Sequence, residues 1–194
     1  NIPIPDCTEH GIVVFNSPGA NAEAVKELEL CSLVMASRDV LGSIGWVRGI
    51  SGEGAAIPKL VEKGKSAFAG PELLGKTLGV IGLGAVDAAW RLSREVLRAD
   101  SVDDIFRNSD YISINVPYTE QTHHMLNAEA FAKMKRGVRI VNESRAEVVD
   151  DEAMTTALES GAVAKYVTDF PNEVILKAPN VIAMPHLGAC TPES

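Results

Sequence analysis

Three side chains in the second half of the chain have the types needed for acid–base chemistry on a ligand that carries a carboxylate. Arg145 follows the apolar run "VRIVNES", Glu173 follows "VAKYVTDF", and His186 ends the run "NVIAMPH". Each run predicts a buried strand, and in open α/β sheets the ligand crevice lies outside the carboxyl ends of the strands. We therefore expect these three side chains to share one crevice.

The chemistry that this set predicts is proton transfer beside a bound carboxylate. Histidine is the usual group for moving a proton near neutral pH, and a carboxylate such as Glu173 would fix its tautomer. Arg145 offers a two-pronged donor to a substrate carboxylate. Taken singly, each residue is more often a loop histidine, a surface ion-pair partner or a solvated acid. Because all three residues occur at the ends of predicted strands, we favour a catalytic role for the set.

A glycine-rich stretch, "TLGVIGLGAVDAAW", adds a possible cofactor loop to this chemistry. Gly82 and Gly84 match the first two positions of the motif G-x-G-x-x-G, in which they allow a tight turn and a close approach to a pyrophosphate. Asp87 stands where the third glycine is expected, and its carboxylate would repel phosphate. A lone G-x-G also fits an ordinary turn from a strand to a helix. With the proton-transfer set, it favours oxidation of a 2-hydroxy acid by a nicotinamide.

The motif's second strand is also missing from its expected place. An acid about 20 residues after the loop, at the end of that strand, normally binds the adenosine ribose. Here residues 88–99 predict a helix, and no strand precedes Ser101. One explanation covers both anomalies: a segment with the third glycine, a helix, a strand and its acid is missing between Val86 and Asp87. We favour omission over deletion, because losing a central strand would leave an unpaired sheet edge.

The elements that would position these residues alternate from Thr77 onward, which predicts an α/β fold with a mostly parallel sheet. Ser101, with Asp104 three residues on, resembles a capping box, and Asn127 is a second helix cap. Strands are expected at 76–84, 110–117, 138–144, 163–170 and 180–186, and helices at 88–99, 101–109, 127–137 and 150–161.

The first 76 residues predict a different organisation. A hinge and a first strand, "GIVVFN", are expected within 1–18, and a long helix over 19–49. Val25, Leu28, Cys31 and Met35 form its apolar stripe, and charges such as Glu29 mark its wetter side. A linker with one short helix is expected over 50–76, and the dinucleotide-binding core over 77–194.

Composition excludes several other classes of protein. Hydrophobic residues make up 46% of the 194 residues, enough for a buried core, and the net charge of −8 argues against nucleic-acid or anionic-membrane surfaces. Three scattered cysteines are typical of reduced thiols in a cytoplasmic protein. No signal peptide or membrane-spanning run is expected. His123 and His124 have no third ligand at metal-binding spacing, so no metal site is expected.

At these motifs the chain resembles the D-isomer-specific 2-hydroxyacid dehydrogenases. The stretches "LLGKTLGVIGLGAV", "SDYISINVPYTEQTHHMLN", "VRIVNESRAEVVDDEAM", "FPNE" and "MPHLGACTPES" carry the resemblance, which covers nearly the whole chain. Within the family it is most similar to the 3-phosphoglycerate dehydrogenases of serine biosynthesis. The resemblance implies a doubly wound, Rossmann-like NAD-binding domain with a long interdomain helix, and a substrate domain that is largely absent from this chain.

The resemblance also implies roles for individual residues. His186 would be the general acid and base, Glu173 its partner, and Arg145 the ligand of the substrate carboxylate. One of Thr168 and Asp169 would contact the nicotinamide amide. The other cofactor positions would be Gly82, Gly84, Ala85 and Val86 at the pyrophosphate, Val116 and Pro117 at the adenosine, Glu143, Ser144 and Arg145 at the nicotinamide ribose, and His186, Leu187, Gly188 and Ala189 beside the nicotinamide.

The function that the resemblance implies is NAD-dependent oxidation of a D-2-hydroxy acid, with 3-phosphoglycerate as the first choice of substrate. A homodimer or larger homo-oligomer is expected, with contacts through Leu28, Cys31, Met35 and Trp46, although these side chains would also suit packing within one subunit. Two alternatives stay open. One is a dehydrogenase for glycerate, lactate or glyoxylate, and the other is an NAD-sensing corepressor or scaffold of the same fold. The preference for NAD over NADP rests on the resemblance alone.

Overall fold

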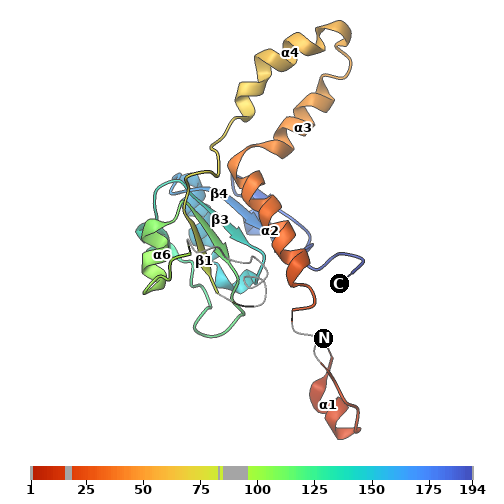
Figure 1. Cartoon of the computed structure of the whole chain (residues 1–194), viewed down its shortest axis with the longest axis vertical. Helices are drawn as coiled ribbons and strands as arrows, with labels where there is room; N and C mark the ends of the chain where they lie inside the picture. Colours follow the sequence, from red (N-terminus) through yellow and green to blue (C-terminus); the bar gives the residue numbers. More distant parts are fainter. Residues whose placement is uncertain (1, 16–18, 83, 85–95, 194) are drawn as a thin grey trace.

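The computed structural model describes residues 2–15, 19–82, 84 and 96–193. Its centre is a parallel sheet of five strands in the order β1-β2-β3-β4-β5 (Figure 1). The strands are β1 (Leu78–Ile81), β2 (Tyr111–Ile114), β3 (Val138–Asn142), β4 (Val163–Thr168) and β5 (Val181–Ala183). This confirms the predicted α/β class with a parallel sheet. Among the described residues the strand order runs in one direction, from β1 to β5, without a reversal.

Both faces of the sheet are buried, as parallel strands require. One face packs against α6 (Val102–Asn108), α7 (Ala128–Lys133), α8 (Asp151–Glu159) and α9 (Glu173–Lys177). Ile112, Ile114 and Ile140 point to that side and are fully buried. The other face carries α2 (Ala22–Ser37), which lies on β3 and β4. Successive strand residues therefore alternate between two separate apolar layers.

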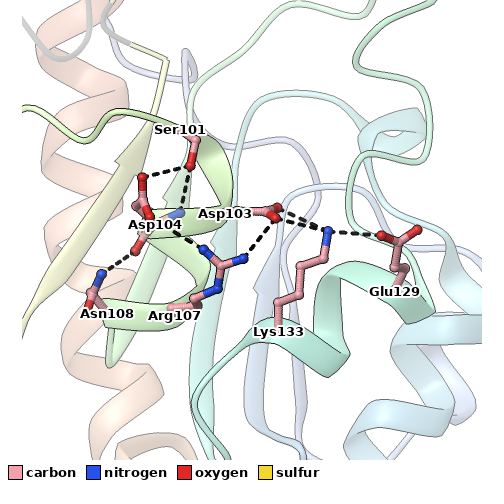
Figure 2. A network of polar contacts seen from close by, with 7 residues as sticks. All are labelled: Ser101, Asp103, Asp104, Arg107, Asn108, Glu129 and Lys133. Atoms are coloured by element: carbon pink, nitrogen blue, oxygen red, sulfur yellow. Dashed lines mark hydrogen bonds and ion pairs between the residues drawn. The ribbon is translucent and has the colours of Figure 1, made fainter.

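The predicted helix starts after Ser101 and Asn127 are confirmed by their hydrogen bonds. Ser101 Oγ accepts from the backbone N–H of Asp104 at 3.2 Å and donates to its carboxylate at 2.7 Å (Figure 2). Asn127 accepts from the N–H of Ala130 at 3.0 Å. Figure 2 also shows Lys133 of α7 bonded to Asp103 of α6, at 3.2 Å. The Lys133–Asp103 contact joins α6 to α7.

The strand predicted in the N-terminal region is wrong. Residues 12–15 run without strand structure, and a short helix, α1 (Ile4–Glu9), precedes them. A strand needs a neighbour to complete its hydrogen bonds, and none of the described residues pairs with this segment. Its apolar side chains are consequently exposed, with Val13 at 71% and Phe15 at 87%.

The single helix predicted over 19–49 is two helices, α2 and α3 (Val40–Gly49), bent by 68°. Arg38 is extended, and Asp39 caps α3 by accepting from the N–H of Gly42 at 3.0 Å. An aspartate offers the backbone this alternative to helical hydrogen bonds, which explains the break. No single helix among the described residues is both long and apolar enough to cross a membrane, although the bent pair α2 and α3 passes that test of length and composition when taken together.

Residues 40–68 form a projection that we call the α3–α4 arm. It contains α3, α4 (Ile57–Gly64) and two 3₁₀ turns, Gly54–Ala56 and Lys65–Phe68, and it extends away from the sheet (Figure 1). The one short helix predicted in the linker is therefore present, with more helical structure around it. Neither α3 nor α4 has a buried residue. Trp46 packs against Phe68 with ring centroids 5.5 Å apart, which joins the two sides of the arm.

The helix predicted over 88–99 lies mostly outside the described residues, and 96–99 have no regular structure.

Candidate functional site

The strands end together at one edge of the sheet, which we call the carboxyl edge. Parallel pairing matches the last residues of β1 to β5 in a row: Ile81, Ile114, Asn142, Thr168 and Ala183. The segments that leave this edge contain every described residue to which we assigned a catalytic or cofactor-binding role. The common edge is where an α/β sheet binds its ligand.

The glycine after β1 is required by the geometry of the chain. Gly82 has a φ of +99°, and a Cβ atom there would lie 2.4 Å from the carbonyl oxygen of Asn115. Only glycine fits such a close approach at a positive φ. Val116 and Pro117 follow Asn115 at the same edge. Ala85 and Val86, with the proposed gap between Val86 and Asp87, lie outside the described residues.

The turn after β3 is held by a residue that the sequence did not single out. Asn142 is fully buried, and its side chain accepts from the N–H of Ser144 at 3.1 Å and donates to the carbonyl of Arg145 at 2.9 Å. The Arg145 guanidinium is exposed and donates to the carbonyl of Ser144 at 2.5 Å. No carboxylate of the described residues forms an ion pair with it, so its charge is available to a ligand.

Thr168 and Asp169, at the end of β4, differ in their hydrogen bonds. Thr168 is fully buried, and its hydroxyl accepts from the N–H of Phe170 at 3.1 Å. Asp169 is 1% exposed, and its Oδ2 accepts from the N–H of Gly188 at 2.9 Å. Its Oδ1 is buried and has no hydrogen-bond partner among the described residues. Because buried polar atoms are nearly always satisfied, this oxygen is open to a further donor.

The segment after β5 lies against β4 through the same aspartate. The N–H of His186 donates to the carbonyl of Asp169 at 3.2 Å, and its ring meets that of Phe170 edge-on, with centroids 5.1 Å apart. His186 has a φ of +55°, a conformation that non-glycine residues rarely adopt. Such backbone strain persists where surrounding contacts impose it, and it is frequent at functional sites. Leu187, Gly188 and Ala189 continue this loop.

The expected contact between Glu173 and His186 is absent from the described structure. Glu173 is the first residue of α9, and its side chain is 84% exposed. Its carboxylate pairs with Lys177, four residues along the helix, at 2.6 Å. A lysine one turn ahead on the same helix is a close local partner. The structure thus brings Arg145, Glu173 and His186 to one edge without joining the acid to the imidazole.

A buried group of acids under α2 was missed, and Glu29 was wrongly expected on the wet side of the helix. Glu29 is 2% exposed, and Asn115 donates to it at 3.0 Å. Glu143, just after β3, is 9% exposed and accepts from the Ser32 hydroxyl at 2.5 Å. Burial raises the pKa of Glu143 to about 8; the Ser32 hydrogen bond opposes this, while the charges of Glu29 and Asp169 add to it. The sequence signal that could have revealed this group was the presence of polar residues within the apolar stripe of a helix.

One other feature of the described residues, a cavity, lies apart from the carboxyl edge. A cavity of about 310 Å³ between Pro71 and Arg139 opens at the amino ends of β1 to β3, and it contains none of the predicted site residues. No group of three or more potential metal ligands occurs among the described residues.

Comparison with known proteins identifies a family whose members match this part of the chain. The model of the D-isomer specific 2-hydroxyacid dehydrogenase NAD binding domain matches residues 88–188, more than half of the chain. The chain belongs to this family. Its five-stranded sheet is therefore part of an NAD(P)-binding domain. The free acceptor of Asp169 and the glycine-only turn at Gly82 fit a dinucleotide at the carboxyl edge.

The relatives carry several different activities. Hydroxypyruvate reductase of Thermotoga maritima is 34% identical over 221 residues, which cover 100% of this chain and 69% of that protein. D-3-phosphoglycerate dehydrogenase of Synechocystis is 33% identical over 221 residues, covering 100% and 38%. The crystal structure of an NADPH-dependent glyoxylate/hydroxypyruvate reductase from Sinorhizobium meliloti, in complex with NADP and malonate, superimposes with a TM-score of 0.74 at 25% identity, covering 99% and 65%.

Proposed function

We propose that this chain is the cofactor-binding part of an NAD(P)-dependent oxidoreductase that interconverts a D-2-hydroxy acid and the 2-oxo acid. The observation that carries the proposal is the buried, unpaired Oδ1 of Asp169, beside the His186–Gly188 loop that the same carboxylate holds. The nicotinamide supplies the hydride acceptor or donor when it is bound. Asp169 would accept from its amide and so orient the ring, while Glu143 and Ser144 would lie at its ribose.

The chain's own residues then perform the acid–base part of the reaction. Arg145 binds the substrate carboxylate and polarises the reacting oxygen, since no described acid neutralises its guanidinium. His186 takes the hydroxyl proton during oxidation and returns it during reduction. Glu173 orients the imidazole, which requires it to leave Lys177 when the ligand arrives. The loop from Gly82 approaches the pyrophosphate, and Val116 and Pro117 flank the adenosine.

The substrate that we propose first is 3-phosphoglycerate, and the second is hydroxypyruvate or glyoxylate. The likeness to the D-3-phosphoglycerate dehydrogenase of Synechocystis supports the first, and the similar likeness to the hydroxypyruvate reductase of Thermotoga maritima supports the second. Each proposed reaction needs the same carboxylate ligand and the same proton shuttle. What would separate them is the pocket for the far end of the substrate.

Steady-state turnover of the full-length protein tests this function. We expect NAD⁺-dependent oxidation of 3-phosphoglycerate, with glycerate and lactate as poorer substrates and NADP⁺ as the poorer cofactor. The reverse reaction is measured with NADH and NADPH on hydroxypyruvate and glyoxylate. Preference for either of these two acids would favour the second substrate. Binding of NADH without turnover of any acid would replace the enzyme with the NAD-sensing alternative.

We also propose that the sequence between Val86 and Asp87 is joined across a missing segment. The alignments to both relatives run over 221 residues against the 194 of this chain, so 27 positions have no counterpart here. The family match begins at residue 88, next to the proposed join. About 27 residues suit a helix and a strand, which would continue the sheet beyond β1.

Peptide mapping of the natural protein shows whether a segment is missing between Val86 and Asp87 or whether these two residues are directly bonded. Trypsin would release residues 77–91 as one peptide, "TLGVIGLGAVDAAWR", if Val86 were bonded to Asp87. We expect this peptide to be absent, and longer peptides containing the extra residues to appear. The neighbouring peptide that follows Arg107 serves as the recovery control. Detection of the 15-residue peptide "TLGVIGLGAVDAAWR" at comparable yield would overturn the proposal.

A further inference from the structure

The carboxyl edge contains a buried group of acidic side chains whose charges the proposed reaction leaves unexplained. Glu143 from the end of β3 and Glu29 from α2 are both buried, and Asp169 lies next along the sheet edge. Neither Glu143 nor Asp169 forms an ion pair with a cation of the described residues. Like charges close together in a poorly hydrated place are costly unless one of them is neutralised. This group therefore requires an explanation.

The hydrogen bonds show which acid can take the proton. Glu143 Oε1 accepts from the hydroxyl of Ser32, and Oε2 is buried with no partner among the described residues. An ionised carboxylate in that position would leave a buried, charged oxygen without a donor from these residues, which is expensive. A proton on Oε2 removes the charge and keeps the bond to Ser32. Asp169 Oδ2 accepts from the N–H of Gly188.

We propose that Glu143 is a positioning residue that acts as a neutral carboxylic acid, holding α2 on the sheet through Ser32 and leaving Asp169 as the charged acceptor for the dinucleotide. This rests on the proposed function, because it assumes that the dinucleotide binds at Asp169. Ionisation of Glu143 would place a further negative charge beside Asp169 and Glu29.

Dinucleotide affinity should then fall as the pH rises through the Glu143 titration. A buried acid whose pKa is raised favours the folded, closed arrangement while it is protonated, and this contribution is lost on ionisation. The groups that face Glu143 are Glu29 and Ser32 from α2 and Asp169 after β4. With a pKa of about 8 for Glu143, and binding by the neutral form alone, the Kd for NADH should rise about tenfold between pH 7 and pH 9.

Titration of the full-length protein with NADH, followed by fluorescence between pH 6 and pH 9.5, tests this. We expect the Kd of Glu143→Gln, which stays neutral, to change less than twofold between pH 7 and pH 9, whatever its absolute value. Ser32→Ala removes a bond that stabilises the ionised form, so its transition should move to higher pH. Glu159→Gln, the same change at an exposed position on α8, is the matched control and should keep the wild-type profile.

Two results would overturn the inference. One is a Glu143→Gln protein whose affinity for NADH still falls tenfold between pH 7 and pH 9, since another group would then be titrating. The other is loss of NADH binding at pH 7 in a folded Glu143→Gln protein, since the charged form would then be needed. If Glu143→Gln does not fold, the Ser32→Ala transition decides alone, and an unmoved transition rejects the inference. Absence of turnover with an intact pH profile would reject only the proposed reaction.

Discussion

Replacing His186 with glutamine is expected to lower kcat by about 10²–10⁴-fold, while the affinity for NADH changes only a few-fold. Glutamine has nearly the reach of histidine and retains hydrogen bonding, but it cannot exchange a proton near neutral pH. The backbone contact of residue 186 with the carbonyl of Asp169 does not depend on the side chain. The loss should therefore fall on the chemical step rather than on the cofactor site.

The measurement is steady-state kinetics with an NADH titration on the same preparations. His10→Gln is the matched control, because His10 follows α1, far along the chain from the carboxyl edge, and is exposed. This control should leave both kcat and the Kd for NADH unchanged. Turnover of His186→Gln within threefold of wild type would remove His186 from the proton-transfer role.

The second large effect is expected on assembly, because we propose that the α3–α4 arm pairs with a second copy of this chain. Leu41, Ile44 and Val47 succeed one another at helical spacing and are 51%, 46% and 47% exposed. Nothing among the described residues covers them, since α3 and α4 have no buried residue. An apolar surface of this kind is typical of subunit contacts.

Ile44→Glu should weaken the dimer by about 30-fold or more, the effect of losing one central apolar contact of about 2 kcal/mol. Sedimentation equilibrium of the full-length protein measures the association constant. Leu176→Glu, at an exposed position of α9, is the control and should not alter it. A wild-type protein that stays monomeric at micromolar concentration would contradict the proposal. The sequence had suggested other contacts, Leu28, Cys31, Met35 and Trp46, and of these Trp46 packs within the arm.

The core of the fold was predictable because its signals are local. The apolar runs that became β1 to β5 need no knowledge of distant residues, since a strand buried on both faces is apolar along its whole length. The same is true of the caps at Ser101 and Asn127, which depend on a side chain and an N–H three residues away. The positions of Arg145, Glu173 and His186 after three of these runs then predicted a site at the strand ends.

The errors concern features that depend on distant partners. Val13 and its neighbours are as apolar as a strand, but no described strand lies beside them. Glu29 looked exposed because it is charged, and its burial depends on Asn115, which is 86 residues away. The ion pair of Glu173 with Lys177 follows from their spacing on one helix, whereas the pairing of Glu173 with His186 stays a prediction. Asn142 shows its role only once the turn after β3 is formed.

The position of α2 in the chain has a consequence for synthesis on the ribosome. Its carbonyl at Ala36 accepts from Arg139 at the start of β3, 103 residues later in the sequence. The apolar surfaces of Leu33 and Ala36 therefore stay unburied until β3 and β4 have been translated. The sheet can add each new strand to the one just made, whereas this helix joins late. During synthesis, α2 is thus a segment whose apolar surface stays open to wrong contacts until those strands are made.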